Sequence, residues 1–436
     1  MLGSRVVKLG GAVIVVALLV GTVVASLTLA PTHGSPLTQE PSNLSTAVGV
    51  HYTIPVGKSP SGGAYDSKNF DVYVSNSKSN NVTVVSSVTH THSSLPVGKS
   101  PADITFDANN GNLYVPNTNS SNVTIISNGN KVIANPGLAK GAHPESAYVD
   151  PADGNVLVTN ASSFPKANVA WLIGNSTNKA TKITLGLGYS EGVAYNPSSK
   201  ELYVANGVSD TLSAITTAGT VKTISLSGEP LFLYPDPATG DLLVPIGPTT
   251  LTGNVSIEVL GSSDTLVATI KVPGVFAIYS GLSAYDPYNH DVYLVGFSYS
   301  KNVSVAVIVS SGNSLAATLF LNKGVSALLS FYDPANGDVY LTGATKNITV
   351  LNQTKVVKTV NLAQPVVLLV YDPTLKDMVG AGDVNRTTTS ILYFVSTTNT
   401  LTSIKVGKEG VAFLYNPKDT FVWVVNLGSN TLQLVG

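Results

Sequence analysis

The chain has 436 residues, and its 24 Lys and Arg residues almost balance its 25 Asp and Glu residues. Charged residues make up 11% of the chain and hydrophobic residues 43%. A nucleic-acid-binding protein needs clustered positive charge and a disordered chain needs low hydrophobicity, so neither class is expected. The absence of cysteine excludes disulfides, thiolate zinc sites and cysteine nucleophiles.

Residues 1–30 predict a signal peptide or an N-terminal membrane anchor. Arg5 and Lys8 precede a run from Gly10 to Ala30 that is mostly apolar and contains no charged residue. Positive residues followed by an apolar run are typical of an export signal, and the run is long enough to cross a ~30 Å hydrocarbon core as a helix. Residues 31–48 are rich in Pro, Ser and Thr and predict a flexible linker.

From residue 49 onward one unit repeats nine times, with a period of about 44 residues. In each unit an apolar run ends in Asp or Asn, usually before Pro, and a second apolar run follows after a few polar residues. This pattern favours a turn, because the short side chain can accept a hydrogen bond from the backbone two residues on. The nine turn residues are Asp66, Asp107, Asp150, Asn196, Asp236, Asp286, Asp333, Asp372 and Asn416.

Each unit contains four strand-sized segments, and no stretch after residue 48 shows sustained helical periodicity. Four strands at this period are typical of a propeller blade. We therefore predict that residues 49–436 form an all-β fold, a single β-propeller of four-stranded antiparallel blades. The repeat count gives nine blades, with eight as the alternative. The last unit lacks a fourth strand, so the N-terminal segment Val50–Gly57 is predicted to complete the last blade and close the ring.

Two motifs in these units resemble a known family. Tyr-Val-x-Asn segments occur at Tyr73–Asn76, Tyr114–Asn117 and Tyr203–Asn206, and Val-Gly-Lys-Ser-Pro linkers occupy residues 56–60 and 97–101. They resemble YVTN-type β-propeller repeats, most clearly in the first four units and the last. Such repeats are frequent in archaeal surface-layer and envelope proteins, so the resemblance implies an extracellular structural or binding role. Related propellers also include lactonase-like and quinoprotein enzymes, and fold alone does not choose among these functions.

Four carboxylates precede the first strands of consecutive units and form the candidate acidic cluster at the mouth of the propeller channel. Together they could hold Ca²⁺ or provide an acid/base pair, whereas the alternative is that they are solvated loop residues. They lie at different distances from the turn residues, so convergence is not required by the spacing. No catalytic motif in usable context accompanies them, so no catalytic residue or other cofactor is assigned. The four residues are Asp103, Glu145, Glu191 and Glu229.

His90 and His92 are the weak candidates for a metal site. If the chain is extended there, both imidazoles point to the same side of a strand, although no third ligand is near in sequence. Exposed histidines on an outer strand are the alternative. Most tyrosines occupy equivalent positions in the repeats, so packing between blades explains them without a sugar ligand.

Five sequons begin the third strand of their units and are candidate N-glycosylation sites of an exported chain. The same Asn-Val/Ile-Thr/Ser pattern is also how the repeat starts that strand. Because strand direction alternates, the five asparagines are expected to lie exposed on the face that holds the four carboxylates. They are Asn81, Asn122, Asn254, Asn302 and Asn347.

These observations favour a non-enzymatic exported protein that acts as an envelope, surface-layer, adhesion or scaffold component. The expected location is extracellular, at the cell surface or anchored in the membrane. The expected partners are the membrane, through the N-terminal segment, and other envelope proteins or surface glycans, and not nucleic acid. One alternative is an extracellular enzyme, lactonase-like or quinoprotein-like, with its site at the channel mouth. The second alternative is a carbohydrate- or peptide-binding module.

Overall fold

The computed structural model describes residues 48–160, 167–187, 190–248, 253–278, 282–382 and 389–436, with the side chains of 167–168 and 190–191 left out. It also describes the backbone of β1 (Arg5–Leu9) and β2 (Ala12–Val16), which pair with each other. The rest of the predicted signal peptide or anchor, and the predicted linker up to residue 47, lie outside the described residues. Among the residues described, no helix is long and apolar enough to cross a membrane.

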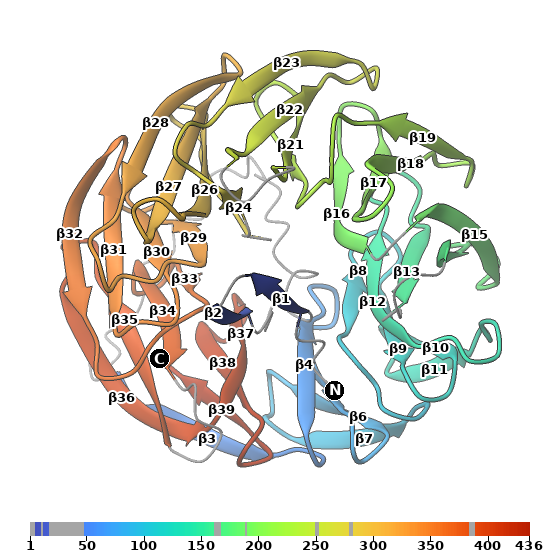
Figure 1. The fold of residues 1–436 in the computed structure, drawn as a ribbon. Coiled ribbons are helices and arrows are strands. Elements are labelled where there is room, and N and C mark those ends of the chain that lie inside the picture. The colour runs from blue at the N-terminus through green and yellow to red at the C-terminus, as the bar shows by residue number, and fades with distance from the viewer. Residues whose placement is uncertain are drawn as a thin grey trace.

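Nine antiparallel sheets stand side by side in a ring (Figure 1), which confirms the propeller fold and the count of nine blades. Blades 1 to 3 consist of β4 (Pro60–Tyr65), β5 (Asp71–Asn76), β6 (Asn81–Ser86) and β7 (His92–Pro96); β8 (Thr105–Asp107), β9 (Asn112–Asn117), β10 (Asn122–Ser127) and β11 (Lys131–Ala134); and β12 (Pro144–Val149), β13 (Val156–Asn160), β14 (Ala167–Ile173) and β15 (Ala180–Leu187).

The next three blades follow the same order from the ring axis outward. They consist of β16 (Ser190–Asn196), β17 (Glu201–Asn206), β18 (Thr211–Ile215) and β19 (Val221–Ser225); β20 (Tyr234–Pro235), β21 (Leu242–Ile246), β22 (Ser256–Leu260) and β23 (Leu266–Lys271); and β24 (Ala277–Ile278), β25 (Ala284–Asp286), β26 (Asp291–Ser298), β27 (Val303–Ser310) and β28 (Ser314–Phe320). In blade 6 both β24 and β25 pair with β26, so they share the place of the first strand.

The last three blades complete the ring. They consist of β29 (Leu329–Tyr332), β30 (Val339–Thr342), β31 (Asn347–Asn352) and β32 (Lys355–Asn361); β33 (Val370–Asp372), β34 (Asp377–Gly382), β35 (Thr389–Val395) and β36 (Leu401–Lys408); and β37 (Gly410–Asn416), β38 (Phe421–Asn426), β39 (Thr431–Val435) and β3 (Val50–Pro55).

The N-terminal strand β3 is the outermost strand of blade 9, which confirms the predicted closure. Thr53 pairs with Gln433 and Ile54 with Leu432. The backbone N–H of Gly49 also donates to the carbonyl of Gly436 at 3.1 Å. The first strand of the ring therefore pairs with the last one in sequence.

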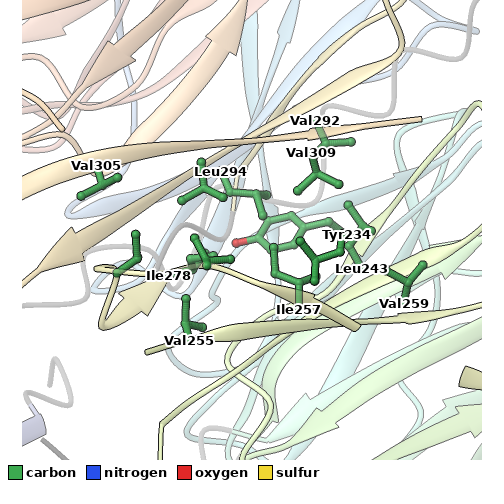
Figure 2. Packing of buried hydrophobic residues seen from close by; sticks show 14 residues of the cluster. Tyr234, Leu243, Val255, Ile257, Val259, Ile278, Val292, Leu294, Val305 and Val309 are labelled. Carbon is green, nitrogen blue, oxygen red and sulfur yellow. The ribbon is translucent and has the colours of Figure 1, made fainter. Parts of the chain in front are cut away.

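The hydrophobic core lies between neighbouring blades rather than at one centre. Figure 2 shows one such layer, in which Val255 and Ile257 of blade 5 face Val292 and Leu294 of blade 6. Because each inner strand is covered on both sides, the strands read as continuous apolar runs and not as alternating ones. In β27 every residue from Val303 to Val309 is buried.

All nine predicted turn residues form the turn for the expected reason. Each Oδ1 accepts a hydrogen bond from the backbone N–H two residues on, at 2.7–2.9 Å. All nine residues are at most 5% exposed.

The asparagine of the Tyr-Val-x-Asn segments is a structural residue that packs against a linker glycine. Asn76 is fully buried, and its Nδ2 donates to Oγ1 of Thr83 at 3.0 Å. A Cβ added to Gly57 would lie 2.7 Å from Cβ of Asn76, so no larger residue fits there. The same crowding joins Gly98 to Asn117, Gly186 to Asn206 and Gly407 to Asn426. The two motifs of the repeat are therefore the two halves of one contact.

Polar side chains link neighbouring blades where the first two strands are joined. The hydroxyl of Tyr73 in blade 1 donates to Oδ1 of Asn130 in blade 2. Nδ2 of Asn130 in turn donates to Oδ2 of Asp71 at 2.7 Å. The hydrogen bonds return to the first blade, so they resist separation of the two sheets.

Candidate functional site

The strand pairing defines two ends of the ring. Pro60 pairs with Asn76, and Asn76 pairs with Asn81. The starts of the first strands and the turns between second and third strands therefore lie at one end, which we call the entrance face. The turns between first and second strands lie at the other end, which we call the turn face.

Asp103 of the predicted acidic cluster is buried on the entrance side of blade 2. Its carboxylate is 6% exposed and accepts the backbone N–H of Ile104 at 3.0 Å. A Cβ added to Gly62 of blade 1 would lie 2.2 Å from Oδ1 of Asp103, so the glycine leaves room for the carboxylate. Burial raises the pKa of Asp103 to about 8, because the charged form loses its hydration. At neutral pH the carboxyl group of Asp103 is therefore mainly protonated.

Glu145 of blade 3 lies near the same place. Its side chain is half-buried, and burial raises its pKa. Tyr148 of the same strand has its pKa raised to about 12, first by burial and then by the negative charge of Glu145 and Asp103. Two of the four predicted carboxyl groups, those of Asp103 and Glu145, are therefore close enough to the hydroxyl of Tyr148 to influence its pKa.

For the other two members of the predicted cluster, Glu191 and Glu229, the described residues give no side-chain contact with Asp103 or Glu145. The side chain of Glu191 lies outside the described residues. Glu229 is half-buried at the start of blade 5, and its backbone carbonyl accepts the N–H of Gly247 at 2.9 Å. Within the described part of the chain, no three His, Asp or Glu side chains come together as a metal-binding group.

The two candidate histidines occupy different environments. His90 is not extended but closes a turn with φ 56°, and its N–H donates to the carbonyl of Ser86 at 2.9 Å. Its ring lies 4.0 Å from the ring of Tyr52, and its Nε2 lies 4.0 Å from Oδ2 of Asp419 in blade 9. His92 is exposed at the start of β7. The extended geometry that would align the two imidazoles is therefore absent, and His90 packs at the boundary where the ring closes.

The five sequon asparagines follow the second strands of their blades and so lie at the entrance face. Asn254 and Asn302 are exposed. The other three are partly buried. Oδ1 of Asn122 accepts from Ser120 and Oδ1 of Asn347 accepts from Thr345, each within the same turn, whereas Nδ2 of Asn81 donates to Ser94 of the outer strand β7.

The sequence places the lysines of the linkers at the entrances of the first strands, but sequence reasoning gave them no functional role. Lys58, Lys99 and Lys408 each follow the glycine that packs against a buried asparagine, and all three are exposed at the entrance face. The signal was present in the repeated Val-Gly-Lys segments, but only the fold places the three lysines in consecutive blades.

The chain matches no protein-family model and no curated protein sequence. Among solved structures, the Dos1 propeller is similar over 89% of this chain and 95% of its own, with a TM-score of 0.58 and 10% identity. The dihydro-heme d1 dehydrogenase NirN in complex with DHE is similar over 71% of this chain, with a TM-score of 0.50 and 14% identity. This chain spans 66% of NirN. At such identities the likeness shows the propeller fold alone.

Proposed function

We propose that the chain is an exported, non-catalytic propeller that is held at the cell surface and presents its entrance face to other envelope components. The observation that carries this proposal is the place where the N-terminal segment joins the ring. Thr431 pairs with Asn426 at the entrance face, whereas Val50 pairs with Val435 at the far end of β39. The chain before Val50 therefore reaches the ring at its outer rim, on the turn face.

A tether at that position leaves the opposite face free. Exposed Asn254 and Asn302 lie on this free face, where a glycan would project away from the tether. The apolar run at Gly10–Ala30 and the resemblance to YVTN-type envelope repeats support the same role. The buried turns and the hydrogen bonds between blades suit a rigid platform.

Protease added to intact cells that make the full chain tests the location. We expect the propeller to be cleaved or released, and the protein to fractionate with the envelope before cleavage. A matched chain that lacks residues 1–30 should stay in the cytoplasm and be protected. Recovery of the full chain only from the cytoplasm would contradict the proposal.

Glycan occupancy of the sequons provides a second measurement. Mass spectrometry of peptides from the native host should find glycans first at Asn254 and Asn302, because their side chains are exposed. Asn81 donates its Nδ2 to Ser94 at 2.7 Å and serves as the internal comparison. Occupancy of Asn81 with Asn254 and Asn302 bare would oppose this assignment of the accessible sites.

Catalysis near the ring axis is a second candidate function, favoured by the buried carboxyl group of Asp103 next to Glu145 and Tyr148. A protonated carboxyl beside a second acid is an arrangement that general acid–base catalysis uses. Screening the chain against lactones is the direct test of the lactonase-like alternative. Hydrolysis that is lost in both Asp103→Asn and Glu145→Gln, with folding retained, would replace the non-catalytic proposal.

A further inference from the structure

Three lysines occupy equivalent positions in three consecutive blades. Lys408, Lys58 and Lys99 precede blades 9, 1 and 2 and follow Gly407, Gly57 and Gly98. Each backbone N–H donates to a serine hydroxyl in the turn between the second and third strands of the blade that follows. These serines are Ser429, Ser79 and Ser120. The lysines are therefore held at fixed places on the entrance face while their side chains remain in water.

Two further lysines extend this set along the same face. The N–H of Lys78 donates to the carbonyl of Lys58 at 3.2 Å, and Lys140 lies in the linker to blade 3. Both side chains are exposed. We call Lys58, Lys78, Lys99, Lys140 and Lys408 the lysine arc, which covers blades 9, 1, 2 and 3.

The positive charge of the lysine arc is not neutralised by ion pairs among the described residues. The lysine ion pair found among the described residues joins Lys222 to Asp264, on the turn face. Of the carboxyl groups nearby, Asp103 is buried and mainly protonated, and burial raises the pKa of Glu145. Glu409 is half-buried beside Lys408 and interacts with another group. Even one full negative charge at Glu409 would leave four of the five lysines without an opposing charge. An excess of positive charge therefore remains on this part of the face.

We propose that the lysine arc binds an anionic polysaccharide, whose carboxylates or sulfates contact several lysines at once. Lys is suited to this role because its ammonium is a mobile point charge on a long stem, and repeated weak contacts along one polymer add up through multivalency. The choice of a polysaccharide rests on the proposed function, because an exported propeller meets surface glycans.

The test measures binding of the purified full chain, in detergent, to immobilised heparin and to polygalacturonate, with neutral dextran as the blank. Heparin supplies sulfates and polygalacturonate supplies carboxylates, so the two probes separate the possible anionic groups. We expect the triple variant Lys58→Gln/Lys99→Gln/Lys408→Gln to bind at least one of the two probes about tenfold more weakly than the unmodified chain. The slope of log Kd against log salt should fall by about 2 because three counterion-releasing contacts are lost.

The matched control removes the same charge from the outer strands. Lys131, Lys182 and Lys271 are exposed in β11, β15 and β23, and Lys131→Gln/Lys182→Gln/Lys271→Gln should change affinity by less than twofold. Equal losses in the two triple variants would overturn the proposal, as would absence of binding to both anionic probes. Tighter binding of a 20-nucleotide single strand than of either polysaccharide would assign the arc to nucleic acid instead. These outcomes do not depend on where the protein resides, so they are distinguishable from failure of the localisation test.

Discussion

Asn399 of blade 8 donates a hydrogen bond from Nδ2 to Oδ2 of Asp338 in blade 7, at 3.0 Å. Its Oδ1 accepts from the hydroxyl of Tyr340 at 2.6 Å. Asn130 makes the same pair of contacts to blade 1, and Asn313 donates to Asp241 of blade 5 at 2.6 Å. At several blade boundaries, the turn between the third and fourth strands of one blade is therefore hydrogen-bonded to the preceding blade.

Removing the hydrogen bonds that Asn399 makes to blade 7 should destabilise the ring. Asn399 has φ 59°, a backbone conformation that glycine adopts without strain. The variant Asn399→Gly therefore deletes the side-chain hydrogen bonds without straining the backbone. We expect a loss of about 2 kcal/mol, because two partly buried partners lose a hydrogen bond. Chemical denaturation measures it. Gln353→Gly is the control, since Gln353 has φ 51° and an exposed side chain, and its stability should change little. Equal effects would show that Asn399 matters only for its backbone.

The contact between linker glycine and buried asparagine predicts a strong steric effect. A Cβ at Gly98 would meet Oγ of Ser120 at 2.3 Å and Cγ of Asn117 at 2.6 Å. We expect Gly98→Ala to cost about 1–3 kcal/mol through overpacking. Gly137→Ala is the matched control, because no atom lies within 4 Å of its added Cβ. Thermal unfolding of the two variants decides the matter, and indistinguishable midpoints would contradict the packing argument.

The closing strand predicts different outcomes for two truncations. Deleting residues 1–58 removes β3 and leaves β39 with an unpaired edge, which favours aggregation. Deleting residues 1–45 keeps β3 and should leave the melting temperature unchanged. Size-exclusion chromatography and thermal unfolding compare the two chains. If both remain monomeric with the same midpoint, pairing of β3 with β39 does not stabilise the ring.

Asp103 predicts a pH dependence with a defined sign. Burial raises its pKa in the folded chain to about 8, far above the value of about 3.9 in an unfolded chain. Between these values the unfolded chain loses a proton that the folded chain keeps. The contribution of the protonated carboxyl is therefore fully present below about pH 4 and is lost as the pH rises towards 8. Asp103→Asn should flatten this decline in the free energy of unfolding, measured by urea titration from pH 4 to pH 8. Parallel curves for the two chains would refute the assignment.

The repeat itself allowed the fold to be predicted from the sequence. Asp286 before Pro287 forms a turn through its own side chain, which is local chemistry that a sequence displays directly. Nine such turns with four strand-sized segments each leave few architectures, and the unmatched segment at Val50 indicates how the ring closes.

Contacts between segments that lie apart in the chain, and the conformation of individual turns, could not be predicted from the sequence. Gly57 and Asn76 are far enough apart in the chain that their packing follows only from the path of the linker over the blade. His90 was expected in an extended segment, but its backbone closes a turn. The three lysines of the Val-Gly-Lys segments look unremarkable singly, and their placement in adjacent blades depends on β3 completing blade 9.

The pairing of β3 with β39 also has a consequence for the order of folding. Thr53 and Gln433, whose side chains are hydrogen-bonded at 3.1 Å, are 380 residues apart in the chain. During synthesis β3 emerges before every other strand of the ring and has no partner until the last strand, β39, has been made. Because contacts between segments far apart in the chain form slowly, we expect closure of the ring to be a late step of folding. A chain whose synthesis stops before β39 would leave unpaired strand edges where the ring should close. Only a chain that includes β39 can therefore form a ring without exposed strand edges at this boundary.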